Sequence, residues 1–369
     1  ESLVADETTL VSFDEGIEEV EKNIDQGSLK IYIEGLRESS RSFFLSRLIQ
    51  SISKPVVVLT SNQNTAENLI GDLRYFCKFN RVQKKIRFFP SWEILPYENI
   101  SPSSGVMGER LEILHLLQRN EISLLVVPVD SIMQSVIPRK ELSDHTFSLG
   151  IGESLEREFL ETCLFDNGFV RLPMVENRGH FSVRGDIVDV YLPASINPVR
   201  VEFFDNTIES IREFDINTQV SLKNIETIEI LPVRELSPTA VRKEDGLKKI
   251  SQYAEEHDVD QVGLNELIDK IKHLDNFFGL EHLAPFFYNR RETLFDYLSK
   301  DALIILDEEA DINCQVEKFC KVVVREYGSA YEHGEVVVSP DKLYLSLSEL
   351  KARLAEKKII SINSLNIEP

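Results

Sequence analysis

Short apolar runs alternate with amphipathic segments along the first part of the chain. The runs at residues 28–36, 55–62 and 123–130, together with IRFFP, are predicted to be strands. Between them, the segment that ends near residue 51, TAENLIGDLRYFCKF and GERLEILHLLQR have apolar residues at helical spacing. Alternation of continuous apolar strands with helices is typical of a parallel sheet that is covered on both faces. The pattern therefore predicts an α/β domain.

The pattern changes near residue 140. A helix is predicted in SLEREFLETCLF, and short alternating strands follow in GHFSVRG, DIVDVYLP, NPVRVEFF and DNTIESIREF. Helices return after about residue 226, and a buried strand within ALIILDEEAD (302–311) precedes a long helix. The order predicts an α/β domain (1–140 and 226–369) that is split by an inserted α+β domain with an antiparallel sheet (141–225).

Charge narrows the classes of partner. The 369 residues include 41 Lys and Arg against 62 Asp and Glu, a formal net charge of −21. Such a surface disfavours broad non-specific binding to nucleic acid, which depends on neutralising phosphates, and favours a partner with basic patches. The four cysteines have no metal-ligand or disulfide spacing, so a reducing, cytoplasmic location is expected. The missing initial Met and the abrupt end at SLNIEP indicate a piece of a longer protein.

The loop after the first strand has the layout of a phosphate-binding loop, G-x-x-x-x-G-K-[ST]. Gly35 and Ser42 fit that pattern, but Ser40 replaces the second Gly and Arg41 replaces the Lys. The second Gly allows close approach of phosphate to the backbone, and Arg is longer and forked where Lys is a point charge. The residues therefore leave two interpretations, an ordinary strand–turn–helix or a degenerate nucleotide site.

The apolar strand that ends in Asp307 and Glu308 resembles a Walker B element. In such an element, Asp orients Mg²⁺ and Glu polarises the attacking water. Alone, an apolar strand followed by DE is common. With the altered loop it indicates an ancestral nucleotide site, and we expect no ATP hydrolysis, no catalytic residue and no metal in this chain.

Strand alternation places three side chains on the outer face of the predicted antiparallel sheet. In NPVRVEFF, Arg200 and Phe204 point away from the apolar valines, and in HFSVRG, Arg184 points away from Phe181. An exposed Phe beside Arg is the type of pair that anchors protein interfaces. The alternative is structural, with Arg200 paired to a neighbouring Glu and Phe204 covering a helix.

The single tryptophan, Trp92, lies in the aromatic turn FFPSWEILPYENISPSSG (88–105). Its ring is of the type that stacks on nucleic-acid bases. Packing against the sheet is the alternative, because such residues are usually buried.

Several segments together resemble the bacterial transcription-repair coupling factor family (Mfd). They are FFPSWEILPYENISPSSGVMGERLEIL, the long block GHFSVRGDIVDVYLPASINPVRVEFFDNTIESIREFDINTQ, which that family shares with the excision-repair protein UvrB, and TLFDYLSKDALIILDEEAD. An intact phosphate loop and a long damage-probing hairpin characterise UvrB, and this chain lacks both. The resemblance therefore favours the UvrB-like N-terminal module of the coupling factor.

This resemblance implies a RecA-like, P-loop-type parallel-sheet domain whose nucleotide site is degenerate, together with an inserted domain that binds UvrA. The positions that match the family's UvrA-contacting residues are Arg184, Arg200 and Phe204. It further implies an adaptor that recruits UvrA to RNA polymerase stalled at DNA damage. ATP, Mg²⁺, DNA and RNA polymerase are expected to bind domains of the parent translocase outside this chain. Residual nucleotide binding or damaged-DNA binding is the alternative function.

Overall fold

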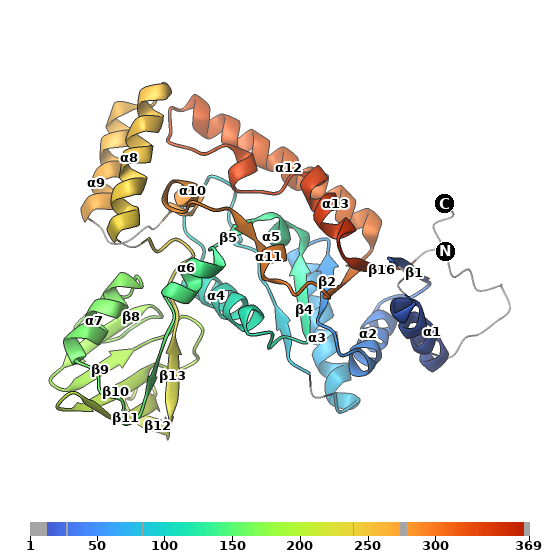
Figure 1. Ribbon diagram of the computed structural model, residues 1–369, viewed down its shortest axis with the longest axis horizontal. Helices are drawn as coiled ribbons and strands as arrows, with labels where there is room; N and C mark the ends of the chain where they lie inside the picture. Colours follow the sequence, from blue (N-terminus) through green and yellow to red (C-terminus); the bar gives the residue numbers. More distant parts are fainter. Residues whose placement is uncertain (1–12, 27–28, 83, 239, 274–278, 365–369) are drawn as a thin grey trace.

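The computed structural model describes residues 13–26, 29–82, 84–238, 240–273 and 279–364. Its larger part is built on a parallel sheet of six strands in the order β1-β16-β15-β2-β4-β3 (Figure 1). The strands are β1 (Lys30–Glu34), β2 (Val56–Thr60), β3 (Ile86–Phe88), β4 (Leu124–Pro128), β15 (Leu303–Asp307) and β16 (Lys358–Asn363). The parallel sheet predicted from the sequence is confirmed.

The central strands divide their side chains between two apolar cores. In β2, Val57 and Leu59 enter one core, whereas Val56 and Val58 enter the other. Successive side chains of a strand point to opposite faces, so a strand covered on both faces must be apolar throughout. The second core is covered by α1 (Phe13–Asp25), α2 (Ser39–Ser51) and α3 (Gln63–Phe79), and the first by α4 (Ser104–Gln118), α5 (Val129–Met133), α12 (Glu309–Glu332) and α13 (Leu347–Ala355).

The inserted domain lies at the lower left of Figure 1 and has its own core. Its six-stranded sheet has the order β12-β11-β10-β9-β8-β7, and only β7 and β8 run parallel. The elements are α7 (Arg157–Asp166), β7 (Val170–Arg171), β8 (His180–Arg184), β9 (Ile187–Val190), β10 (Val199–Phe204), β11 (Thr207–Phe214) and β12 (Ser221–Asn224). Leu160 and Leu164 of α7 fill the core beneath this sheet. The predicted insertion of an antiparallel α+β unit is confirmed.

Two short strands join this unit to the α/β domain. The chain enters along β6 (Phe147–Gly150) and leaves along β13 (Thr227–Ile230), and the two pair antiparallel. Helices were expected from about residue 226, but TIEI is a strand because Ile228 and Ile230 alternate into the core of the inserted domain. Helix α4 also meets this domain directly, since a Cβ built on Gly108 would lie 2.5 Å from the backbone of Pro193.

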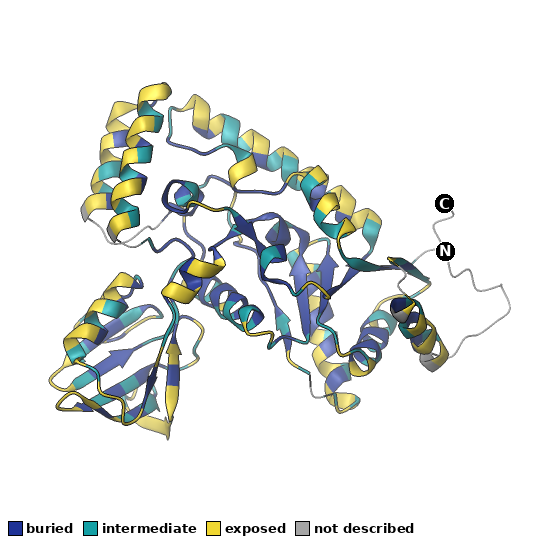
Figure 2. Ribbon diagram, in the orientation of Figure 1, coloured by how far each residue is buried: buried dark blue, intermediate teal, exposed yellow. Residues whose placement is uncertain are grey.

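The remaining elements lie in the centre and on the upper side of the molecule in Figure 1. They are β5 (Ser135–Val136), α6 (Arg139–Asp144), α8 (Ala240–Glu256), α9 (Gln261–His273), η1 (Glu281–Leu283), α10 (Ala284–Phe287), β14 (Glu292–Thr293), α11 (Leu294–Tyr297) and η2 (Pro340–Lys342). In Figure 2 the parallel sheet is buried, whereas α8, α9 and α12 expose one face along their length. Within the described ranges, no helix combines the length and the apolarity that a membrane span requires.

Candidate functional site

The loop that follows β1 is folded on its own polar groups. Gly35 takes a left-handed φ of +85°, and its N–H donates to the carbonyl of Asn363 at 3.0 Å. The Ser40 hydroxyl accepts from the backbone N–H of Arg37 at 2.9 Å and donates to the carbonyl of the same residue at 2.5 Å. A phosphate loop needs free backbone N–H groups that converge on the anion. Here a side chain at the position of the second glycine occupies one of them.

Arg41 lies between the altered loop and the end of β15. Its guanidinium donates to Asp307 and, at 2.7 Å, to Oε1 of Glu308. Only 14% of the Arg41 side chain and 2% of the Asp307 side chain are exposed. Burial raises the pKa of Asp307 to about 6, although the guanidinium of Arg41 opposes that rise. In a nucleotide enzyme the Asp would orient Mg²⁺ and the Glu would polarise water, but here both carboxylates are joined to a cation of the chain itself.

The third expected polar group is directed elsewhere. Ser42 is buried in α2, and its hydroxyl lies 3.4 Å from Oδ2 of Asp72 on α3. The structure therefore brings Arg41, Asp307 and Glu308 into contact but leaves Ser42 out of that cluster. Within the part of the chain that is described, no group of three His, Cys, Asp or Glu side chains is arranged to hold a metal ion.

The outer face of the inserted sheet is organised by Asp189, which was not anticipated. Strand pairing sets Asp189 beside Ser182 of β8 and beside Arg200 of β10. Its buried carboxylate accepts from Arg184 Nη2 at 2.6 Å, from Arg200 Nε at 2.7 Å and from Arg200 Nη2 at 3.0 Å. One carboxylate thus aligns two of the three predicted residues. The signal in the sequence was the turn Gly185–Asp186, because a two-residue hairpin loop fixes this register.

Arg200 is a largely internal residue. Its guanidinium lies 4.6 Å from the centre of the Phe214 ring and donates to Gln219 at 3.2 Å. Only 15% of its side chain is exposed, against 48% for Arg184. Arg200 therefore supports the face more than it forms the contact surface. Its carboxylate partner is Asp189 and not the neighbouring Glu of the structural alternative.

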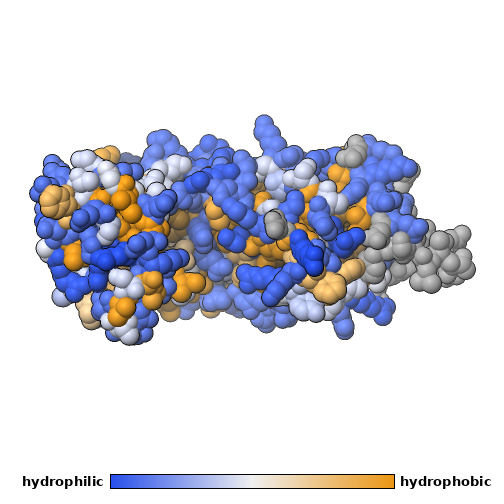
Figure 3. Space-filling view, turned by 90° about the horizontal axis from the view of Figure 1, so that it is seen from below, coloured by the Kyte–Doolittle hydropathy of each residue, from blue (hydrophilic) through white to orange (hydrophobic). Residues whose placement is uncertain are grey.

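Phe204 ends β10, opposite Thr207, and 68% of the residue is exposed. A buried Phe side chain gains free energy in proportion to the apolar area removed from water, so an exposed ring leaves that gain for a partner. Phe204 does not cover a helix. In the space-filling view from below, hydrophobic side chains gather over the inserted domain at the left (Figure 3). The predicted face therefore presents an exposed ring on β10, the strand that carries Arg200, whereas Arg184 lies at the end of β8.

Trp92 and the groove beside α12 are weaker candidates for a binding or reactive site. Trp92 is buried and its Nε1 lies 3.4 Å from Glu235, so its ring cannot stack on a base.

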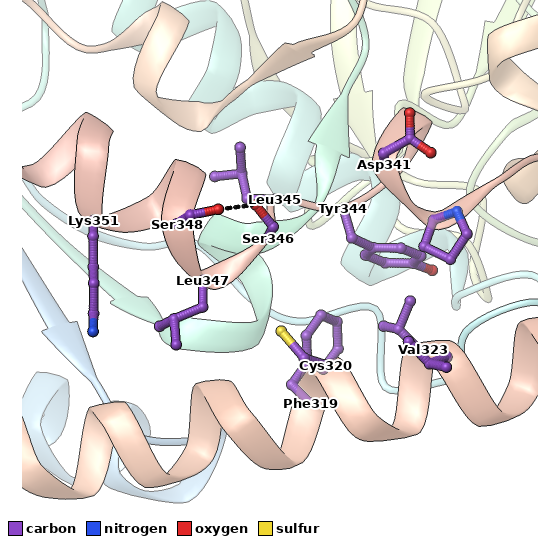
Figure 4. A pocket seen from close by; sticks show the side chains of 12 residues that line it. Phe319, Cys320, Val323, Asp341, Tyr344, Leu345, Ser346, Leu347, Ser348 and Lys351 are labelled. Carbon is purple, nitrogen blue, oxygen red and sulfur yellow. Dashed lines mark hydrogen bonds between the residues drawn. The ribbon is translucent and has the colours of Figure 1, made fainter.

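A groove of about 740 Å³ lies between α12 and the start of α13 (Figure 4). Its walls are apolar, and Ser346 at its rim is hydrogen-bonded to Ser348 and caps α13. Burial raises the pKa of the Cys320 thiol there, which disfavours the reactive thiolate.

Comparison with known proteins gives this geometry a context. Residues 147–236, which include Arg184, Asp189, Arg200 and Phe204, match the family described as UvrB interaction domain. The chain is similar to transcription-repair-coupling factors from Myxococcus xanthus (28% identity, 92% of this chain and 29% of the relative) and Haemophilus influenzae (30%, 79% and 26%). It is also similar to that of Bacillus subtilis (25% identity, 97% of this chain and 31% of the relative). The chain thus spans less than a third of the length of these relatives.

Proposed function

We propose that this chain, which carries a UvrB interaction domain at residues 147–236 and resembles transcription-repair-coupling factors over most of its length, is a non-catalytic adaptor module. It recruits UvrA to RNA polymerase stalled at DNA damage in the cytoplasm. UvrA docks on the outer face of the inserted sheet, where Phe204 and Arg184 touch the partner and Arg200 supports them. RNA polymerase, the DNA along which the longer protein translocates, ATP and Mg²⁺ bind parts of that protein that this chain does not contain.

The observation that carries the proposal is the combination of an exposed ring with a preset arginine. Phe204 is 68% exposed, and Arg184 is oriented by the buried carboxylate of Asp189. Binding hot spots are enriched in aromatic residues and Arg, and a pre-oriented side chain loses less entropy on binding. The net charge of −21 fits a partner whose docking surface is basic around an acidic or aromatic pocket.

The non-catalytic part of the proposal rests on Arg41. A nucleotide would have to displace its guanidinium from both Asp307 and Glu308 before Mg²⁺ could reach them. Ligands that bind only the folded state raise its melting temperature by mass action. We therefore expect no rise of the melting temperature with ATP and Mg²⁺ in the low millimolar range. A clear rise would favour the alternative of residual nucleotide binding.

The docking role is tested by surface plasmon resonance with immobilised UvrA. The wild-type chain should bind, and Arg184→Glu should weaken binding about thirtyfold, because hot-spot substitutions cost at least about 2 kcal/mol. The matched control is Arg171→Glu, since Arg171 is similarly exposed on the same sheet but pairs with Glu161 of α7. Equal binding by the wild type and Arg184→Glu would place the contact elsewhere, and no binding by the wild type would contradict the adaptor role.

A further inference from the structure

A strongly basic segment interrupts this acidic chain. Residues 74–87, RYFCKFNRVQKKIR, contain six Lys and Arg and no Asp or Glu, whereas the whole chain has 41 basic and 62 acidic residues. The segment also carries three aromatic residues. It covers the end of α3 and the connection to β3, on the face of the parallel sheet opposite α12 and α13. Neither the docking face nor the altered nucleotide loop includes it.

The end of α3 exposes cations and rings together. Arg74, Tyr75, Lys78 and Phe79 are spaced i, i+1, i+4 and i+5, so they share one face of the helix. Tyr75 is 66% exposed and Phe79 is 70% exposed, while Cys77 on the other side is buried in the core. This end of α3 projects at the lower edge of Figure 1 and is largely exposed in Figure 2.

Internal contacts account for only part of this surface. The Tyr75 ring meets Phe76 edge-on at 5.3 Å, which orients the tyrosine without covering it. Lys85 pairs with Glu121 at 2.6 Å, and Lys84 donates to the carbonyl of Ile52 at 3.3 Å. Arg87 donates to the carbonyl of Ile86 at 3.2 Å.

The four cations other than Lys84 and Lys85 differ in what they face. Burial raises the pKa of the Glu109 carboxyl, and Arg74 and Arg87 lie near enough to oppose that rise. Among the described residues, Lys78 and Arg81 form no ion pair within 4.0 Å. A cation in the last turn of a helix interacts favourably with the helix dipole, so Lys78 can be explained by its effect on helix stability. The helix dipole does not explain Arg81, which follows the helix, or the exposure of the two rings.

Exposed rings beside free cations match the chemistry of a single nucleic-acid strand. Phosphates pair with cations, and unpaired bases stack on aromatic rings, whereas a duplex hides the faces of its bases. An acidic peptide would use the cations but would leave both rings without a role. The charge of −21 repels a polyanion at long range, so binding at such a patch is weak and falls steeply with salt.

We propose that the end of α3 binds a short single-stranded nucleic-acid segment, with phosphates at Lys78 and Arg81 and bases against Tyr75 and Phe79. The site is separate from the outer face of the inserted sheet, so the proposal does not depend on UvrA binding. It also differs from a damage-probing hairpin, because the rings lie on a rigid helix and recognise no particular base. Arg74 steers the strand but remains partly directed at Glu109.

The test is fluorescence anisotropy of labelled oligo(dT) with the full chain at about 20 mM salt, where non-specific affinities of roughly 10⁻⁴ to 10⁻⁶ M are measurable. Removing either ring, by Tyr75→Ala or Phe79→Ala, should weaken binding about fivefold or more. The pair Lys78→Gln and Arg81→Gln should reduce the slope of log K against log salt by roughly 0.7 for each phosphate that is no longer neutralised.

Matched controls separate this patch from general charge and folding effects. Lys318→Gln with Lys321→Gln removes two exposed cations from α12, and Phe159→Ala removes a 57% exposed ring from α7. Both should bind oligo(dT) like the wild type. The proposal is overturned by absent binding at low salt, by ring variants that bind like the wild type, or by polyglutamate that competes as well as oligo(dT). The last result would assign the patch to an acidic protein.

Discussion

Arg41→Met tests whether the guanidinium is an internal replacement for a bound cation. Methionine keeps most of the apolar stem of the side chain and removes the charge. The buried Asp307 then loses its main counter-ion, and the side chain of Glu308 keeps, among the described residues, the backbone N–H of Ser364 at 3.0 Å. Removing one partner of a fully buried ion pair costs about 3–5 kcal/mol. Because 14% of Arg41 and 24% of Glu308 remain exposed, we expect about 2–3 kcal/mol near neutral pH.

The pH dependence identifies Asp307 as the source of this loss. Its pKa is raised from 3.8 to about 6, so its protonated form is favoured in the folded chain. Such a group contributes stability below its unfolded pKa and loses that contribution as the pH rises through the folded pKa. Without Arg41, which lowers this pKa, the folded value rises further. The difference in stability between the wild type and Arg41→Met should therefore be small at about pH 5 and full at about pH 8.

The assay is thermal unfolding followed by circular dichroism at both pH values. We expect Arg41→Met to lower the melting temperature by roughly 5–10 °C at the higher pH, at roughly 2–4 °C per kcal/mol. Arg37→Met is the matched control, because Arg37 is exposed in the same loop and its side chain donates to the Ser364 carbonyl at 3.3 Å but contacts no carboxylate among the described residues. It should change stability by less than about 0.5 kcal/mol. An equal loss at both pH values, or a loss no larger than that of Arg37→Met, would refute the reasoning.

Two further predictions concern the inserted domain. Gly108→Ala places a Cβ 2.5 Å from the Pro193 backbone and should lower the free energy of unfolding, measured in urea, by about 1–3 kcal/mol. Gly71→Ala is the control, because Gly71 has open space around it in α3, and it should be neutral or stabilising. Equal effects of the two substitutions would contradict the close contact. Asp189→Asn should weaken UvrA binding because it releases Arg184. Adding Asp189→Asn to Arg184→Ala should therefore cause little further loss of affinity. A fully additive loss in this double-mutant cycle would show that Asp189 does not act through Arg184.

The parallel sheet was predictable because its signals are local. The apolar runs that became β1, β2, β4 and β15 are continuous and are separated by helical periodicity, which identifies strands covered on both faces. Strand β16 (Lys358–Asn363) was missed. Its alternation of isoleucine with Ser and Asn is short, and its place between β1 and β15 depends on pairing with segments far away in the sequence. Such long-range pairing leaves no local pattern.

The candidate face was predictable in its direction but not in its contacts. A two-residue period is enough to place Arg184, Arg200 and Phe204 away from the valine core. It cannot state that Arg200 is covered by Phe214 and Gln219, because that depends on a shift of register between Glu213 and Phe214 and on the turn that follows. The same holds for the altered phosphate loop. The sequence shows that its second Gly and its Lys are missing. It does not show that Arg41 pairs with both Asp307 and Glu308, because that contact forms only when β1 and β15 are assembled in one sheet.

The most direct test of the account is calorimetric titration of UvrA with the wild-type chain, Phe204→Ala and Phe159→Ala. Both phenylalanines lie in the inserted domain, with 68% and 57% of their surface exposed, so either substitution should leave the fold intact. The account predicts that Phe159→Ala binds like the wild type and that Phe204→Ala binds about thirtyfold or more weakly, as expected for loss of a hot spot. Equal affinities for all three, or no binding by the wild type, would contradict it.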